Sequence, residues 1–274
     1  MEGVVGAEVV EAAADVEGKI MIFRKMSSGC EKKSSTTLET INEELKKLVL
    51  NIQNAFPGDL RMVAIFGSLA KGNFNPQSSD INILMVIDKL DLGGLERLHS
   101  IINNTMIQTL ISPILLRKEE LPHFAEVFPI KVLEIKNCYK VLSGDDLVKG
   151  IIIEKRYLRL RCEQELRNIL SRMRRGLVLG FNNNNLLASN FSRFFAYYLS
   201  TLKAISYLMD YKDGDPIIHS AKSLQIDTEA INKLIELKKR SPKAWSVSDI
   251  ENACYSFLEV LEKTISALDS VAEK

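Results

Sequence analysis

The chain reads VAIFGSLAKG at residues 63–72 and DINILMV at residues 80–86. The first stretch is an apolar run that ends in a Gly-Ser pair, and the second passes from an acid into another apolar run. Short apolar runs separated by a loop with glycine and proline are typical of neighbouring strands. This segment therefore predicts a strand over residues 61–66, a loop, and a second strand over residues 81–87.

The Gly67-Ser68 pair is suited to holding an anion, and phosphate is the obvious candidate. Glycine lets the backbone approach a ligand, while exposed amides and a hydroxyl can donate hydrogen bonds to it. Asp80 follows Ser68 by 12 residues, and the period of a strand puts Asp80 and Asn82 on one face. Both side chains are expected to point toward the turn. A Gly-Ser pair taken alone is more often a plain structural turn.

The whole segment resembles the signature of the DNA polymerase beta-like nucleotidyltransferase superfamily. That signature is a hydrophobic residue, Gly-Ser or Gly-Gly, about a dozen residues, and then Asp-hydrophobic-Asp/Glu-hydrophobic. Phe66, Gly67 and Ser68 match its first part, and residues 80–83 align with its second part, with Asn82 at the position of the second acid. Downstream, the stretch YKVLSGDD at residues 139–146 is similar to the end of the catalytic domain in members with an antibiotic-nucleotidyltransferase-like layout. The resemblance covers residues 38–148.

This resemblance implies an α/β (α+β) nucleotidyltransferase fold with a small mixed sheet. It also implies Mg²⁺-dependent transfer of a nucleoside monophosphate from a nucleoside triphosphate to a hydroxyl acceptor, on a small molecule or a macromolecule. By position, Gly67 and Ser68 would contact phosphate, Lys71 would neutralise it, and Asp80 would be the main ligand of a two-ion Mg²⁺ site. A lysine beside a loop is more often simply a solvated surface residue.

The sequence departs from the superfamily pattern at Asn82, where a second carboxylate is expected. Two Mg²⁺ ions repel each other and are normally held by several anionic oxygens, so this change should weaken the site. Residues 111–116 contain no acid either, which leaves Glu134 as the nearest candidate for a third metal ligand or as a surface glutamate. The alternative to an active enzyme is therefore a catalytically degraded nucleotide-binding or protein-interaction module.

The pattern along the chain predicts three regions. Residues 1–37 are rich in small and polar side chains and are expected to form a weakly ordered leader. Residues 38–148 alternate between helix and strand patterns, as expected for the nucleotidyltransferase-like domain. They begin with a helix that Thr36 or Thr37 can cap, and they close with an apolar stretch at residues 132–142. Residues 149–274 show apolar side chains at helical spacing over residues 158–177, 190–209, 228–240 and 254–268, which predicts an all-α helical bundle.

Two features of the bundle region have a functional and a structural interpretation. Residues 154–175 hold eight basic and three acidic side chains, which could steer a triphosphate or an RNA backbone. A solvated helix face with ion pairs explains the same excess, and we favour it. The aromatic side chains between Phe191 and Tyr198 could stack on a base, but their helical spacing favours core packing.

The composition excludes several classes of protein. The 274 residues carry 36 Lys and Arg against 35 Asp and Glu, which argues against a protein that coats polyanions along its whole length. No apolar run approaches the roughly 20 residues of a membrane span, and the acidic N-terminus does not resemble a secretory signal, so a cytoplasmic protein without a membrane partner is expected. Widely spaced cysteines and histidines argue against zinc. The oligomeric state stays open, a homodimer included.

Overall fold

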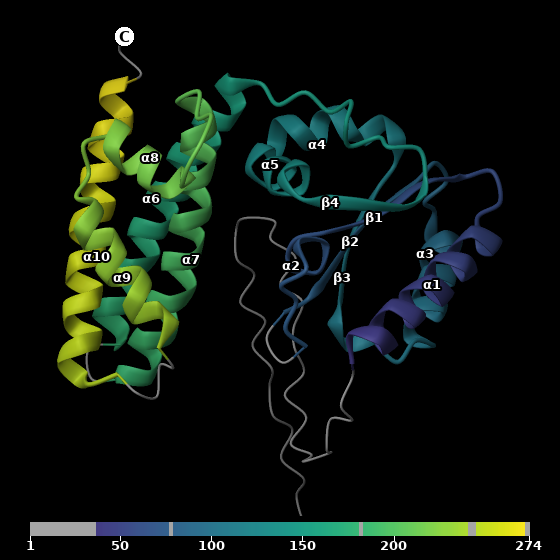
Figure 1. Cartoon of the computed structure of the whole chain (residues 1–274), viewed down its shortest axis with the longest axis horizontal. Helices are drawn as coiled ribbons and strands as arrows, with labels where there is room; N and C mark the ends of the chain where they lie inside the picture. Colours follow the sequence, from purple (N-terminus) through teal and green to yellow (C-terminus); the bar gives the residue numbers. More distant parts are fainter. Residues whose placement is uncertain (1–36, 77–78, 181–182, 241–244, 272–274) are drawn as a thin grey trace, which may run out of the picture. The chain divides into compact units, whose positions relative to one another are not determined.

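The computed structural model describes residues 37–76, 79–180, 183–240 and 245–271, and these contain a four-stranded mixed sheet (Figure 1). The strands are β1 (Leu60–Phe66), β2 (Ile81–Ile87), β3 (Ile111–Leu116) and β4 (Tyr139–Gly144), in the order β3-β2-β1-β4. β1 is antiparallel to β2 and β4, while β2 and β3 are parallel. The small mixed sheet expected from the sequence is confirmed.

Helices cover both faces of this sheet because the strands bury alternate side chains on each side. On one face, Ile83 and Met85 pack with side chains of α1 (Leu38–Ala55) and α3 (Leu92–Asn103). On the other face, Leu84 and Val86 pack with side chains of α4 (Leu121–Val127) and α5 (Pro129–Asn137), and Figure 1 shows both helices on this side of the sheet. The two faces thus have separate apolar cores, and the second face is the one that carries the candidate site.

Local signals in the sequence explain where the helices of this region begin. Thr37 caps α1 by accepting a hydrogen bond from the amide of Thr40, as the predicted Thr36 or Thr37 cap required. The apolar stretch at residues 132–142 divides into the end of α5 and the start of β4. Pro129 at the start of α5 favours the helix, and extended backbone at Cys138 ends it. An apolar run without a clear period does not reveal such a division.

The region after β4 is helical, as predicted. It contains α6 (Lys155–Gly180), α7 (Asn184–Leu208), α8 (Pro216–Ser223), α9 (Thr228–Lys239) and α10 (Val247–Val271). The sequence pattern predicts four of these helices but not α8. Its eight residues are too few for a clear apolar period, and Asp215 and Pro216 supply its start.

The aromatic side chains of α7 lie in the bundle core, which confirms the packing interpretation. Phe195 is fully buried and makes an edge contact with Phe257 of α10, with ring centroids 5.2 Å apart. Tyr198 is also buried, and its hydroxyl is 2.8 Å from Thr264 Oγ1. These side chains are therefore committed to holding α7 against α10 and not to stacking on a base.

The basic side chains of α6 are largely engaged in ion pairs within the chain. Arg161 pairs with Glu165 on the same helix. Arg167 reaches Asp269 at 2.9 Å, and Arg174 reaches Glu262 at 2.7 Å, so both join α6 to α10. The structure thus supports the ion-paired helix face that we favoured over an electrostatic steering surface.

Two expectations from the sequence concern the chain as a whole. In the part of the chain that the structure describes, no helix combines the length and apolar character needed to cross a bilayer. The predicted leader, apart from Thr37, lies outside the described residues.

Candidate functional site

The Gly-Ser turn follows β1 directly and has a backbone that requires glycine. Gly67 has φ 77° and ψ −143°, a conformation that side-chain-bearing residues rarely adopt. Its amide donates to the carbonyl of Cys138 at 3.3 Å, and the chain then enters the four-residue helix α2 (Ser68–Lys71). The first amides of a helix have no partner inside it, so those after Gly67 are groups from which an anion could accept hydrogen bonds.

Asn82 lies beside this turn, as its place in the strand predicted. It pairs with Phe66 in the register of β1 and β2. A Cβ atom added to Gly67 would be 3.1 Å from Asn82 Nδ2, so the amide group packs close to the turn. Asp80 precedes β2 and is exposed to solvent, and it does not line the cleft described below. The structure therefore brings Gly67 and Asn82 together, and Asp80 stands outside their contact.

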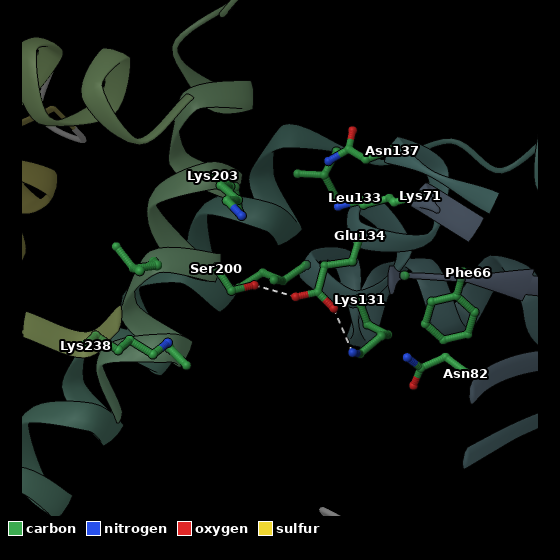
Figure 2. Close-up of a pocket in the computed structure, with 15 residues that line it drawn as sticks. Phe66, Lys71, Asn82, Lys131, Leu133, Glu134, Asn137, Ser200, Lys203 and Lys238 are labelled. Carbon is green, nitrogen blue, oxygen red and sulfur yellow. Dashed lines mark hydrogen bonds and ion pairs between the residues drawn. The ribbon is translucent and has the colours of Figure 1, made fainter. Parts of the chain in front are cut away.

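A cleft of about 300 Å³ opens at the turn and extends to the helical bundle (Figure 2). Residues from β1, α2 and β2 line one side, α5 lines another, and α7 and α9 complete it. The lining side chains with polar ends are Lys71, Asn82, Lys131, Glu134, Asn137, Ser200, Lys203 and Lys238. Two of the predicted site residues besides Asn82, namely Lys71 and Glu134, thus share this cleft with Gly67.

Glu134 bridges the two regions of the chain that meet in the cleft. It lies on α5 and accepts a hydrogen bond from Lys131 Nζ at 2.7 Å. Its other carboxylate oxygen accepts a hydrogen bond from the Ser200 hydroxyl of α7, and Figure 2 shows both contacts. The carboxylate predicted as a metal ligand is therefore already engaged by an ammonium group and a hydroxyl group.

The donor atoms near the turn do not fit a resident two-ion Mg²⁺ site. In the parallel register of β2 and β3, Asn82 stands beside Ser112, so the next position on this face offers a hydroxyl and not a carboxylate. Over the described ranges, no group of three or more His, Cys, Asp and Glu side chains is arranged to hold a metal ion. One carboxylate, an amide and a hydroxyl are too little negative charge for two divalent cations.

The cleft is instead strongly basic. Four lysines line it against one glutamate, and that glutamate is paired with Lys131. Lys71, Lys203 and Lys238 make no ion pair with a residue that the structure describes. Burial lowers the pKa of the half-buried Lys238 ammonium, and the nearby positive charge of Lys203 lowers it further. The chemistry of this cleft therefore suits a polyanion.

Sequence reasoning missed the cleft residues outside the motif: Lys131, Asn137, Ser200, Lys203 and Lys238. Lys131 could have been predicted from the sequence, because it lies on the same helix as the candidate residue Glu134. Ser200 and Lys203 are polar residues of α7 that do not belong to its buried, core-facing set. Polar residues at such positions are ordinarily just solvated. Nothing local in the sequence connects them to the Gly-Ser turn.

Comparison with known proteins agrees with this geometry. Residues 38–158 match the nucleotidyltransferase domain family. This match assigns residues 38–158, and not the chain as a whole, to the nucleotidyltransferase family. No curated protein matches the sequence.

Two solved structures are similar to this chain, and only the first has a TM-score that indicates a shared fold. The spectinomycin adenyltransferase AAD(9) from Enterococcus faecialis, solved with ATP and spectinomycin, is 13% identical with a TM-score of 0.50, covering 81% of this chain and 98% of that one. A nucleotidyltransferase-like protein from Exiguobacterium sibiricum is 13% identical with a TM-score of 0.32, covering 82% of this chain and 75% of that one. At 13% identity, the similarity to the spectinomycin adenyltransferase concerns the fold alone.

Proposed function

We propose that the chain binds a nucleoside triphosphate in the cleft and transfers its nucleoside monophosphate to a hydroxyl acceptor. The observation that carries this proposal is the meeting of the turn at Gly67 with a basic cleft, to which Lys71 of the adjoining helix α2 contributes an ammonium group. Lysine ammonium groups and helix-start amides are the usual partners of phosphate oxygens. The superfamily of residues 38–158 supports transfer as the reaction.

The proposed reaction places the nucleotide at the turn and the acceptor toward the bundle. The acceptor hydroxyl oxygen bonds to the α-phosphorus, and the bond from that phosphorus to the bridging oxygen of the β-phosphate breaks. Pyrophosphate leaves with the bonding electrons, and lysines such as Lys71 offset its growing negative charge. Glu134 is the carboxylate of the cleft, so it is the side chain there that can accept the hydroxyl proton.

The roles of the individual motif residues are part of this proposal. Gly67 and Ser68 would hold phosphate oxygens through backbone amides and the Ser68 hydroxyl. A divalent ion enters only as a component of the metal-nucleotide substrate, with Asp80 and the carbonyl oxygen of Asn82 as its nearest protein donors. We derive no catalytic step from a second ion, because Asn82 and Ser112 offer it no charge.

A second candidate function is nucleotide binding without transfer. It is favoured by the two uncharged side chains, Asn82 and Ser112, that stand side by side next to the Gly-Ser turn. In this case the cleft would hold the triphosphate and the chain would act as a nucleotide-responsive binding module. Both candidates share the nucleotide and differ only in the chemistry that follows.

Labelled nucleotides separate the two candidates. The purified chain is incubated with each α-labelled nucleoside triphosphate, Mg²⁺ or Mn²⁺, and cell extract, and labelled products are resolved. We expect a product that falls about a hundredfold or more in Asp80→Ala, because the carboxylate proposed to hold the divalent ion of the metal-nucleotide substrate is lost. Asp213→Ala, in an exposed loop outside the cleft, should leave the product unchanged. Retained triphosphate binding without any product would overturn transfer and leave the binding module.

A further inference from the structure

The bundle side of the cleft carries two lysines that differ from their neighbours. Lys203 of α7 and Lys238 of α9 line the cleft and make no hydrogen bond or ion pair with a residue in the described ranges. On the same helix α9, Lys233 pairs with Glu229 at 2.8 Å and Lys239 pairs with Glu236 at 2.6 Å. Among the lysines of α7 and α9, the unpaired ammonium groups are thus those that face the cleft.

The neighbouring positive charges of Lys203 and Lys238 repel each other while no anion occupies the cleft. Lys238 is half-buried, and both burial and the charge of Lys203 lower its pKa. Partial burial without a counter-charge and the neighbouring charge of the exposed Lys203 both disfavour the charged form of Lys238, and an anion placed between the two lysines reverses this effect. Such an arrangement is typical of a binding site whose ligand is absent.

The two lysines stand apart from the proposed nucleotide position. Figure 2 shows Lys203 and Lys238 on the bundle side of the cleft, with Glu134 between them and the side that holds Phe66 and Asn82. The Gly67-Ser68 turn and Lys71 belong to that second side. A triphosphate held at the turn would therefore leave Lys203 and Lys238 for a second anionic group.

The size and surroundings of the cleft favour a small ligand over a nucleic acid. Its volume of about 300 Å³ is at the lower end for small-molecule sites. A nucleic-acid strand needs a continuous basic track for its phosphates. The nearby basic helix α6 does not supply one, since Arg167 and Arg174 are paired with acids of α10.

We infer that Lys203 and Lys238 bind the phosphate group of the acceptor, which is a small hydroxyl compound carrying a phosphomonoester. A phosphomonoester is dianionic near neutral pH, and two ammonium groups match that charge. This inference rests on the proposed function and names the substrate class of the same cleft. It also means that a cationic acceptor such as an aminocyclitol antibiotic would be repelled from this side.

Calorimetric titration of the full chain tests the inference with glycerol phosphate as the probe. The chain is first saturated with Mg²⁺ and α,β-methylene-ATP, an analogue whose altered α–β bridge prevents transfer. We expect glycerol phosphate to bind beside the analogue, and to bind about tenfold or more weakly in Lys203→Gln/Lys238→Gln, because charge-assisted contacts to phosphate are lost. The affinity for the nucleotide analogue should change by less than about twofold.

Matched variants show whether charge at these positions is the cause. Lys233→Gln removes a lysine of α9 that does not line the cleft, and it should bind glycerol phosphate as the unchanged chain does. Lys203→Arg keeps the charge and should retain most of the affinity lost in Lys203→Gln. Equal weakening in both Lys203 variants would contradict the inference, as would binding of the basic antibiotic spectinomycin with similar affinity.

The remaining outcomes distinguish this inference from the proposed function. Competition between glycerol phosphate and the nucleotide analogue, or an equal loss of both affinities, would assign the lysines to the triphosphate and overturn the inference. Binding of a single-stranded oligonucleotide that depends on Lys203 and Lys238, with no binding of glycerol phosphate, would overturn it in favour of a nucleic-acid acceptor. Glycerol phosphate binding without any nucleotide binding would overturn the proposed function and leave the phosphate site.

Discussion

The two sides of the cleft are built in different ways. The side formed by β1, α2 and β2, here called the domain side, depends on backbone geometry. Gly67 adopts φ 77° and ψ −143°, and strand register places Asn82 against it. The bundle side is formed by charged side chains. Lys203 and Lys238 reach the cleft from two helices whose packing is decided by an apolar core. A turn whose backbone requires glycine can be recognised in the local sequence. A charged side chain that reaches the cleft through helix packing cannot.

The first prediction concerns the support of the bundle side. Phe195→Ala should lower the free energy of unfolding by about 3–5 kcal/mol, because it opens a cavity in the aromatic core that packs α7 against α10. Urea denaturation measures this loss. Tyr207→Ala on the same helix, where the side chain is 42% exposed, should cost under about 1 kcal/mol. Similar losses in both variants would mean that α7 is not anchored through this aromatic core.

The second prediction concerns the domain side. Gly67→Ala should cost about 1–3 kcal/mol of stability, since its backbone is strained for any other residue and the new methyl group approaches Asn82 at 3.1 Å. ATP binding should be lost at the same time. Gly72→Ala is the matched control: it has the same φ of 77° but no heavy atom within 4 Å of the added carbon. If Gly72→Ala also abolished ATP binding, the specific role of the Gly67 turn would be refuted.

The third prediction tests the contact that joins the two sides. Ser200 donates a hydrogen bond to Glu134, and a double-mutant cycle with Ser200→Ala and Glu134→Gln should give a coupling energy of about 0.5–1.5 kcal/mol. Chemical denaturation of the four proteins measures it. A coupling energy near zero would mean that the domain and the bundle are joined by other contacts.

The fourth prediction sharpens the difference in charge between the sides. Asn82→Asp should tighten Mg²⁺-dependent ATP binding by about threefold to tenfold, because a carboxylate beside the turn attracts the metal-nucleotide complex. Without a divalent ion, the same variant should bind ATP more weakly, since the new charge repels phosphate. Calorimetry with and without Mg²⁺ separates the two effects. An affinity that is unchanged in both conditions would show that position 82 does not face the bound nucleotide.

The smallest predicted effect is a pH dependence of stability. The pKa of Lys238 is lowered from its ordinary 10.5, so between the lowered value and 10.5 the unfolded chain holds a proton that the folded chain has released. Stability attributable to Lys238 should therefore rise with pH across this window, and Lys238→Gln should remove that rise. Thermal unfolding across the alkaline range measures it.

Lys233 supplies a control of opposite sign for this pH dependence. The carboxylate of Glu229 raises the pKa of Lys233. Its contribution is therefore complete below 10.5 and is lost as the pH rises through the higher folded value. Lys233→Gln should remove this loss, and a response in the same direction as that of Lys238→Gln would contradict the assignment.

The sequence predicted the parts of the fold that have a strong local signal. The strands at residues 60–66 and 81–87 and the cap at Thr37 are where the patterns put them, because alternation and capping depend on near neighbours. The division of residues 132–142 between helix and strand, and the short helix α8, escaped prediction. In both places the segment is too short for its period to decide, and packing against neighbouring elements does so instead.

The residues of the candidate site likewise separate into those that the local sequence predicts and those that it does not. By itself the sequence determined the nucleotidyltransferase fold and the Gly-Ser turn, and it pointed to the uncharged side chain at position 82, because glycine conformation and strand alternation are set by residues next to each other. Only the tertiary structure decided that Ser112 stands beside Asn82 and that Glu134 is bridged by Ser200. It also placed Lys203 and Lys238 across the cleft, since contacts between distant segments follow from how whole elements bury their apolar faces.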